Sequence, residues 1–244
     1  MILKINNREG FIKNFLTPIS RLTTTTTLDI ENNISTLAHN NSNIFLKAMY
    51  NITWDDHPQA GLLCLPDTNK LIKILSCLEE ENIELKINDN CINYNNGKGN
   101  RFRYHLFDDS LQTNTPFDFD KIKTLEFETS FIFTKEKNNN MLKALPFVTE
   151  TSKVYIETED NNVYAELADK KLQNTDSYTI LISDKLKGQP LSYELILDIE
   201  LFRLISTLNY DNAEIYINNK FKMLLLKLNI DECELTFVST SYKS

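Results

Sequence analysis

Two neighbouring stretches, Leu71–Leu78 (LIKILSCL) and Asn82–Asn88 (NIELKIN), decide the fold because both occur twice. The second occurrence reads Leu201–Leu208 (LFRLISTL) and Asn212–Asn218 (NAEIYIN), 130 residues later and without a gap. In both occurrences the first stretch has apolar residues at helical spacing, and the second alternates as a strand does. Self-similarity at a fixed offset predicts two copies of one structural unit.

Further matches extend this repeat over most of the chain. They are Phe11–Lys13 with Met141–Lys143 at offset 130, Glu31–Ile34 with Asp160–Val163 at offset 129, and Phe107 with Phe237 at offset 130. Chance explains two short matches easily, but it does not explain several matches in the same order at nearly one offset. The alternative is two unrelated α+β stretches with similar patterns.

Each half has the same predicted order of elements. A strand (Ile2–Ile5 or Leu125–Phe133) precedes a helix (Arg8–Ile19 or Lys135–Leu145). The next predicted strands are Leu28–Ile30, Ile44–Tyr50 and Gly61–Leu65 in the first half, and Val154–Ile156, Tyr178–Ser183 and Tyr193–Leu197 in the second. The closing strands are Ile83–Ile87, Cys91–Tyr94 and Arg101–Phe107, then Glu214–Ile217, Lys222–Leu228 and Glu234–Val238.

Short polar motifs mark the turns and caps between these elements. The pairs Asn32-Asn33 and Asn161-Asn162 are expected to supply the positive φ of a tight hairpin. Asp67 and Asp198 precede the repeated helix and are expected to accept hydrogen bonds from its first free amides. The segment Asp108–Lys121 contains Pro116 and shows neither a helical period nor strand alternation. We therefore predict a first domain at 1–108, a linker at 109–121 and a second domain at 122–244.

Composition excludes several classes of protein. The 244 residues carry 26 Lys and Arg against 34 Asp and Glu, a net charge of −8, which argues against nucleic-acid binding over the whole surface but leaves room for a local basic patch. The five glycines form no phosphate-binding loop, which disfavours P-loop NTPases and Rossmann dehydrogenases. The four cysteines form no C-x-x-C pair, so we interpret them as buried free thiols. With no signal peptide or membrane span in the sequence, we expect a cytoplasmic protein, in the host cell if it is viral.

The helices carry cations on one stripe and apolar residues on the other. In the helix after Asp67, Lys70, Lys73 and Cys77 share a face, and the other face holds Leu71, Ile74, Leu75 and Leu78. Arg203 stands at the place of Lys73 in the repeat, whereas Glu200 stands at the place of Lys70. Lys13 and Lys143 are equivalent in the first helices, with Arg8, Lys135 and Lys137 nearby. Taken alone, these cations are better explained as ordinary solvated helix faces, since Glu79, Glu80, Glu136 and Glu200 lie on or beside the same helices.

Signatures of catalysis are missing from the sequence. The histidines (His39, His57, His105) have no metal-ligand spacing, and no G-x-S-x-G motif occurs. Asp55, Asp56 and His57 could form a metal or acid–base site, although a solvated turn explains them equally well. Gly97-Lys98-Gly99 indicates a turn. We therefore expect no catalytic residues, no metal and no cofactor.

Taken together, the repeat, the two helices per repeat, the acidic net charge and the helix cations resemble those of DNA polymerase sliding clamps. The resemblance covers essentially the whole chain, and it is closest to the clamps of T-even-type bacteriophages, which are similar to proliferating cell nuclear antigen. It implies an α+β DNA-clamp fold of two similar domains, each with two helices packed on antiparallel sheets, that assembles into a ring. The implied function is to encircle duplex DNA and tether the replicative DNA polymerase for processive synthesis.

The resemblance also implies partners and site residues. The partners are double-stranded DNA without sequence preference, a DNA polymerase, an ATP-dependent clamp loader and two further copies of the chain in a homotrimer, with no membrane. The implied DNA-facing residues are Arg8, Lys13, Lys70, Lys73, Lys135, Lys137, Lys143 and Arg203. The implied pocket for a partner peptide contains Leu46, Leu111, Pro116, Phe117, Phe119 and Phe237, unless the linker phenylalanines only pin the linker to the sheet. The implied subunit interface joins Arg101–Phe107 of one chain to Tyr178–Ser183 of the next, through Phe102, Tyr104, Leu106, Tyr178, Ile180 and Ile182.

Two other classes remain open on the sequence alone. One is a β-rich structural or assembly protein of a virus with no DNA role, in which helix cations would have no reason to keep repeat register. The other is an enzyme whose site is assembled from scattered residues around Asp55, Asp56 and His57.

Overall fold

The computed structural model describes residues 1–41, 43–52, 60–88, 90–108, 117–148, 152–168, 170 and 176–242. Asp55, Asp56 and His57 of the enzyme hypothesis lie outside these residues, as do Leu111 and Pro116 of the predicted pocket. The chain forms two compact units. Unit 1 contains 1–40, 46–117 and 229–235, and unit 2 contains 41–45, 118–228 and 236–244. No helix in the described part of the chain is both long enough and apolar enough to cross a membrane.

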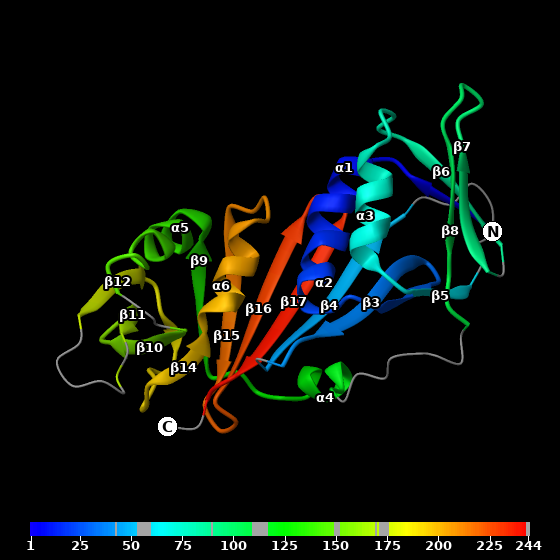
Figure 1. Cartoon of the computed structure of the whole chain (residues 1–244). Coiled ribbons are helices and arrows are strands. Elements are labelled where there is room, and N and C mark those ends of the chain that lie inside the picture. The colour runs from blue at the N-terminus through cyan, green and yellow to red at the C-terminus, as the bar shows by residue number, and fades with distance from the viewer. Residues whose placement is uncertain are drawn as a thin grey trace. The chain divides into compact units, whose positions relative to one another are not determined.

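In its described residues, the first half of the chain runs through eight strands and four helical segments (Figure 1). The strands are β1 (Ile2–Ile5), β2 (Thr26–Ile30), β3 (Asn33–His39), β4 (Ile44–Asn51), β5 (Gly61–Leu65), β6 (Ile83–Asn88), β7 (Cys91–Asn95) and β8 (Arg101–His105). The helices are α1 (Arg8–Gly10), which continues without a break through the π-helix η1 (Phe11–Leu16) into α2 (Thr17–Leu22), and α3 (Thr68–Ser76).

The second half repeats this order. After α4 (Phe119–Lys123), its helices are α5 (Lys135–Lys143) and α6 (Ile199–Ser206). Its strands are β9 (Thr129–Thr134), β10 (Lys153–Glu159), β11 (Asn162–Ala168), β12 (Ser177–Ser183), β13 (Lys187–Gly188), β14 (Leu195–Asp198), β15 (Asn212–Asn218), β16 (Met223–Ile230) and β17 (Cys233–Thr240).

Strand order confirms the internal repeat. One set of four strands is ordered β1-β6-β7-β8 in the first half and β9-β15-β16-β17 in the second. The other set is ordered β4-β3-β2-β5 in the first half and β12-β11-β10-β14 in the second. The repeated sequence stretches fall on α3 and α6 and on β6 and β15, so each copy of the sequence occupies the same place in the topology.

Hydrogen bonds from the predicted caps start the repeated helices. The Asp67 carboxylate accepts from the backbone N–H of Lys70 at 3.0 Å, and that of Asp198 accepts from the N–H of Glu200 at 2.8 Å. These bonds satisfy amides that have no partner within the helix. The hydroxyl of Tyr104, on β8, donates to the Asp67 carbonyl at 2.7 Å and accepts from the Asp67 N–H at 3.1 Å. The backbone N–H and the carbonyl of Asp67 are thereby both hydrogen-bonded to the neighbouring sheet.

Aromatic side chains hold the helices on their sheets within each unit. In unit 1, Phe11 and Phe15 stack with centroids 5.3 Å apart, and Tyr50 of β4 meets Phe11 edge-on at 4.9 Å. In unit 2, Phe133 of β9 meets Phe202 of α6 edge-on at 5.9 Å. All five rings are buried, so each contributes the burial of a large apolar surface as well as the ring contact.

Several local predictions are corrected by the structure. The Asn-Asn pairs do not supply the positive φ: in the hairpin between β10 and β11 that conformation belongs to Asp160 (φ 52°). The predicted linker is not wholly irregular, because Asp118 accepts from the amides of Asp120 and Lys121 and starts α4. Strand β9 begins four residues after the predicted Leu125, and β14 begins at Leu195, not at Tyr193.

The Asp67 cap gives a test of the fold. Asp67→Ala removes the bond to the Lys70 amide and is expected to lower the free energy of unfolding by about 1 kcal/mol. Asp67→Asn keeps an oxygen acceptor and should stay near the wild-type value, with chemical denaturation midpoints as the measurement. Equal losses for the two variants would contradict the capping role.

Candidate functional site

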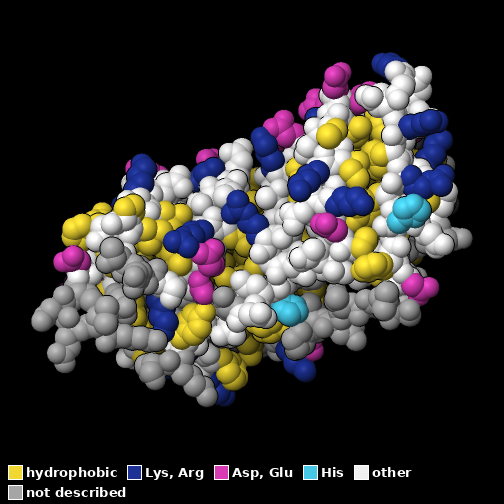
Figure 2. All heavy atoms as spheres, viewed as in Figure 1, with side chains coloured by type: hydrophobic (Ala, Val, Ile, Leu, Met, Phe, Trp, Pro, Cys, Tyr) yellow, Lys and Arg dark blue, Asp and Glu magenta, His cyan; other side chains and the backbone are white. Residues whose placement is uncertain are grey.

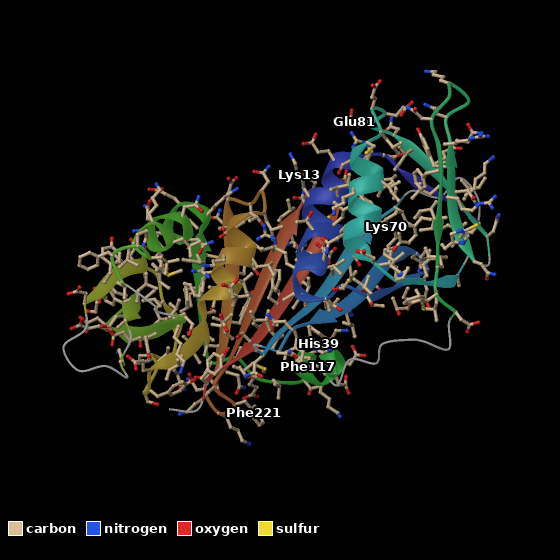
Figure 3. The ribbon with its side chains drawn as sticks, in the orientation of Figure 1. Lys13, His39, Lys70, Glu81, Phe117 and Phe221 are labelled. Carbon is tan, nitrogen blue, oxygen red and sulfur yellow. The ribbon has the colours of Figure 1, made fainter. Side chains whose placement is uncertain are left out.

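The cations of α3 lie on the face that the sheet leaves free. Leu71 and Leu75 are buried, whereas Lys70 and Lys73 are exposed, as helical spacing predicts. Figure 2 shows dark-blue side chains over the helices of unit 1, and Figure 3 labels Lys13 and Lys70 on this helical layer. Cys77 shares this exposed face, so the prediction that every cysteine is buried is wrong at this position.

Arg8 differs from the other predicted cations because its side chain makes hydrogen bonds that hold the fold together. Its Nε donates to the Glu80 carbonyl at 2.8 Å, and its Nη1 donates to the Leu75 carbonyl at 3.1 Å. These carbonyls lie at and just beyond the C-terminal end of α3, where the unpaired carbonyls and the helix dipole favour a cation. Arg8 therefore joins the first helix to the end of the second, and two of its five N–H donors are engaged in that contact.

The Glu80 side chain belongs to a separate polar cluster beside that contact. Its carboxylate accepts from the Asn96 amide at 2.7 Å and from the Tyr94 hydroxyl at 3.0 Å. The bond from Asn96, followed by a bond from the Glu80 backbone amide and then by the bond from Tyr94, holds the pKa of Glu80 below its ordinary value. Glu80 therefore stays ionised at neutral pH and anchors the hairpin between β7 and β8.

In unit 2 the predicted cations are less uniform. Lys143 and Arg203 are exposed, but Lys135 and Lys137 are half-buried, and the Lys135 ammonium lies 6.0 Å from the centre of the Tyr210 ring. The helices themselves are joined by Asn138, which is fully buried and donates to the Phe202 carbonyl at 3.0 Å. Met141 of α5 is fully buried, whereas Leu142 and Leu145, which lies just beyond the helix, are half-buried.

Exposed acids neutralise two of the helix cations. Lys13 pairs with Glu9 one turn earlier, and Arg203 pairs with Glu200. The hydrogen bond and the charge of Lys13 hold the pKa of Glu9 below its ordinary value. Exposed pairs of this kind are worth at most about 1 kcal/mol, so an incoming phosphate can replace the carboxylate at little cost. The exposed helix faces of both units can therefore contact an anion. In unit 2 the attraction for an anion is weaker near the carboxylate of Glu200.

The predicted peptide pocket is only partly accessible. Leu46 and Phe237 are fully buried, and Phe119 is 7% exposed. A side chain in the core cannot touch a docked peptide, so the assignment of Leu46, Phe119 and Phe237 to a docking surface is wrong. Phe117, labelled in Figure 3, is half-buried, so part of its side chain is accessible. Of the predicted pocket residues that the structure describes, Phe117 is thus the one that can contact a partner.

The two predicted joining segments are edge strands. β8 ends the order β1-β6-β7-β8, and β12 ends the order β12-β11-β10-β14. An edge strand leaves one row of backbone donors and acceptors without a partner in its own sheet, which favours pairing with another strand. Both segments therefore have the geometry that strand addition requires.

The side chains assigned to that interface divide into two groups. Tyr104 and Ile182 are buried, and burial raises the pKa of Tyr104 to about 12. Their assignment to the interface is corrected, because both belong to the core of their own unit. Phe102, Leu106 and Ile180 are half-buried, and Tyr178 is 37% exposed, so these four can still be covered by a neighbour.

β8 carries a row of exposed basic side chains that was not predicted from the sequence. Arg101, Arg103 and His105 alternate with Phe102 and Tyr104, and all three basic side chains are exposed. The alternation R-F-R-Y-H is visible in the sequence and could have identified a basic strand face. Among the described residues, no group of three or more His, Cys, Asp or Glu side chains is placed to hold a metal ion.

Comparison with solved structures identifies the fold. A chain of the PCNA2-PCNA3 complex from Sulfolobus tokodaii superposes with a TM-score of 0.75 at 12% identity, covering 99% of both chains. A "Putative DNA polymerase III beta subunit" from Eubacterium rectale superposes with a TM-score of 0.74 at 14% identity, covering 100% of this chain and 65% of the other. No protein-family model and no curated protein sequence matches the chain. The chain has the DNA-clamp fold of these two proteins along its whole length.

Mutation distinguishes Arg8, which stabilises the fold, from Lys73, which is exposed on α3. Arg8→Ala removes two charged hydrogen bonds to carbonyls and is expected to lower the free energy of unfolding by about 1–3 kcal/mol. Lys73→Ala, at an exposed position on α3, should change it by less than about 0.5 kcal/mol. Thermal and chemical unfolding measure both, and equal effects would contradict the assignment of Arg8 to the fold.

Proposed function

We propose that this protein is a sliding clamp, a ring that encircles duplex DNA and tethers the replicative DNA polymerase. The observation that carries the proposal is the clamp fold over the whole chain, combined with exposed cations on the helical layer of both units. Its role is binding and not catalysis. It needs no cofactor of its own, and the ATP chemistry of loading belongs to a separate loader protein.

Weak and dispersed contacts suit such a ring. A closed ring leaves DNA only by opening or by passing an end, so its residence does not require tight binding. Contacts to phosphate carry no sequence information and break easily, which permits sliding. The residues proposed to make them are Lys13, Lys70, Lys73, Lys143 and Arg203, with Lys135 and Lys137 contributing less because they are half-buried. Arg8 is removed from this set because its guanidinium holds α3.

The ring is proposed to be a homotrimer of two-domain chains, with domains 1–108 and 122–244 joined by the linker 109–121. Each chain supplies both joining strands, since β8 and β12 are edge strands of different sheets. Head-to-tail addition of β8 to β12 of the next copy removes both edges when the ring closes. The solved relative from Sulfolobus tokodaii is a complex of two different chains, whereas here one sequence carries both ends of the junction. A bacteriophage source and a place in the host cytoplasm belong to the same proposal.

The polymerase is proposed to bind through a short apolar peptide at Phe117. Tethering by such a peptide raises the local concentration of the polymerase at the primer end without a large interface. Phe117 is the accessible aromatic residue among the predicted pocket residues that the structure describes. The structural-protein alternative gives no reason for exposed cations at equivalent places, such as Lys73 and Arg203, on the repeated helices.

Retention on circular DNA tests the proposed function. The chain is loaded on a nicked plasmid by its cognate loader and ATP, and the complex is isolated by gel filtration. We expect co-elution with circular DNA and loss after the plasmid is cut once, since only a topological link depends on the absence of ends. Equal retention on circular and linear DNA would show adhesive binding, and absence of retention on either would reject the clamp function.

Charge reversal tests the assigned face. Lys73→Glu with Arg203→Glu reverses two phosphate contacts per chain and is expected to lower loading and to shorten polymerase products, more strongly as salt is raised. Lys187→Glu with Lys220→Glu is the matched control, since both lysines are exposed and lie outside the helices. The assigned face is wrong if the two double variants load and support synthesis equally well.

Substitution of Phe117 tests the docking site. Phe117→Ala should weaken binding of the polymerase at least about tenfold, the usual effect of truncating an aromatic anchor, without changing the mass of the ring. Phe119→Ala is a control for folding, because that side chain is buried and its loss should instead lower thermal stability. An unchanged polymerase affinity for Phe117→Ala would place the docking site elsewhere.

A further inference from the structure

The sheet β1-β6-β7-β8 has one apolar and one basic face. Its register places Lys4 opposite Glu84, Lys86 opposite Asn93, and Asn93 opposite Arg103, so these side chains share the face that points away from the core. Arg101 and His105 follow on the same face of β8, two residues to either side of Arg103. The cations of this face (Lys4, Lys86, Arg101, Arg103) outnumber its one carboxylate (Glu84) in a chain whose net charge is −8.

The basic row is concentrated at the free edge of that sheet. Arg101, Arg103 and His105 are exposed, and the Nε of Arg103 donates to the Asn93 side chain at 3.1 Å, which holds its guanidinium over the sheet. Within the described part of the chain, neither Arg101 nor Arg103 takes part in an ion pair. The corresponding face of unit 2 is not basic, since Lys227 there lies opposite Glu214. The charge is therefore a property of β8 and not of the repeat.

The edge strand of unit 2 has the opposite character. Asp176 and Asp184 stand immediately before and after β12, and both are exposed. On the next strand, Glu166 lies opposite Thr179, but its carboxylate is paired with Lys170 at 2.7 Å, so the unpaired charge of this outward face comes from the exposed Glu157 of β10. The first residues of β12, Ser177–Thr179, are exposed on both faces, as expected for a strand that another strand covers in the assembly.

Geometry makes these two outward faces continuous when the edges join. On β8 the apolar face is the one toward α3, because Tyr104 bonds the α3 cap residue Asp67. On β12 the apolar side is covered by α5. Joining the edges with all helices on one side brings the outward row of β8 beside the outward row of β12. Because carboxylates stand at both ends of β12, cations meet carboxylates whichever direction the strands take.

We propose that the junction between copies of this chain is selected by charge, with Arg101 and Arg103 of one subunit facing Asp176 and Asp184 of the next. This inference rests on the ring of the proposed function and adds the pairing rule for its junction. Opposite charges across the edge favour the head-to-tail contact, and two β8 edges or two β12 edges repel each other. The apolar residues supply contact area, and the charges supply direction and register.

Charge exchange tests the pairing rule. Arg101→Glu with Arg103→Glu makes both edges acidic, and Asp176→Lys with Asp184→Lys makes both edges basic. Each double variant is expected to weaken self-association at least about tenfold near physiological salt, measured as solution mass against concentration. All four substitutions in one chain restore opposite charges and should restore the assembly. In an equimolar mixture of the two double variants, both junctions between unlike chains join opposite charges, but a ring of three must contain one junction between like chains and should not close.

A matched control lies on the same sheet. Lys4→Glu with Lys86→Glu makes the same change of charge on the same face, but on β1 and β6, at the side of the sheet opposite to β8. This variant should assemble as the wild type does. Arg101→Gln with Arg103→Gln is a milder test that keeps side-chain length, and its association should depend less on salt than that of the wild type.

The outcomes separate this inference from the proposed function. A wild-type chain that stays monomeric at every concentration would overturn the ring itself. A trimeric wild type with an equally trimeric Arg101→Glu and Arg103→Glu variant would overturn only the pairing rule. The rule is also overturned if the variant with all four substitutions melts like the wild type but remains monomeric. Equal weakening of self-association in the control and the edge variants would overturn it as well.

Discussion

Each helix of this protein can bury only one stripe on its sheet, and the rest of the molecule depends on that constraint. In α3 the residues Leu71 and Leu75 enter the core, so helical spacing leaves Lys70 and Lys73 in solvent. Buried aromatic rings such as Phe133 against Phe202 set the helix faces further. A cationic layer on one side of each unit is therefore a by-product of core packing, and it needs no separate device to position it.

The two units share one strand topology, but the residues at their surfaces differ. Strand order is the same in both halves, yet Glu200 replaces a lysine on the repeated helix, and Phe107, which is 43% exposed, corresponds to the fully buried Phe237. The equivalent outer faces differ as well, since Arg103 is set among neutral and basic neighbours whereas Lys227 is balanced by Glu214. The two edge strands differ in topology as well, since β8 ends one of the repeated sets of strands and β12 ends the other.

Local sequence patterns predicted most helices, strands and caps well. They did not predict how these elements pack against one another. The strand Gly61–Leu65 and the caps at Asp67 and Asp198 were found from sequence because turn and cap chemistry acts over a few residues. The π-helix inside the first helix was not predicted, and it widens the turn that holds Phe11 and Phe15 against Tyr50. The cap residues of the first helices, Asn7 and Thr134, are 127 residues apart, which is four residues fewer than the 131 between the caps Asp67 and Asp198 of α3 and α6.

The sequence by itself determined the duplication, the amphipathic helices and the absence of a phosphate-binding loop, since these depend on residue order and spacing alone. Only the tertiary structure decided which charges are available. Arg8 and Lys73 look alike in the sequence, but strand pairing and helix packing bring Arg8 to the carbonyls of Leu75 and Glu80. The same long-range pairings made β8 and β12 edges and placed Phe237 in the core. Burial and pairing of this kind join residues far apart in the chain, and spacing within one element does not encode them.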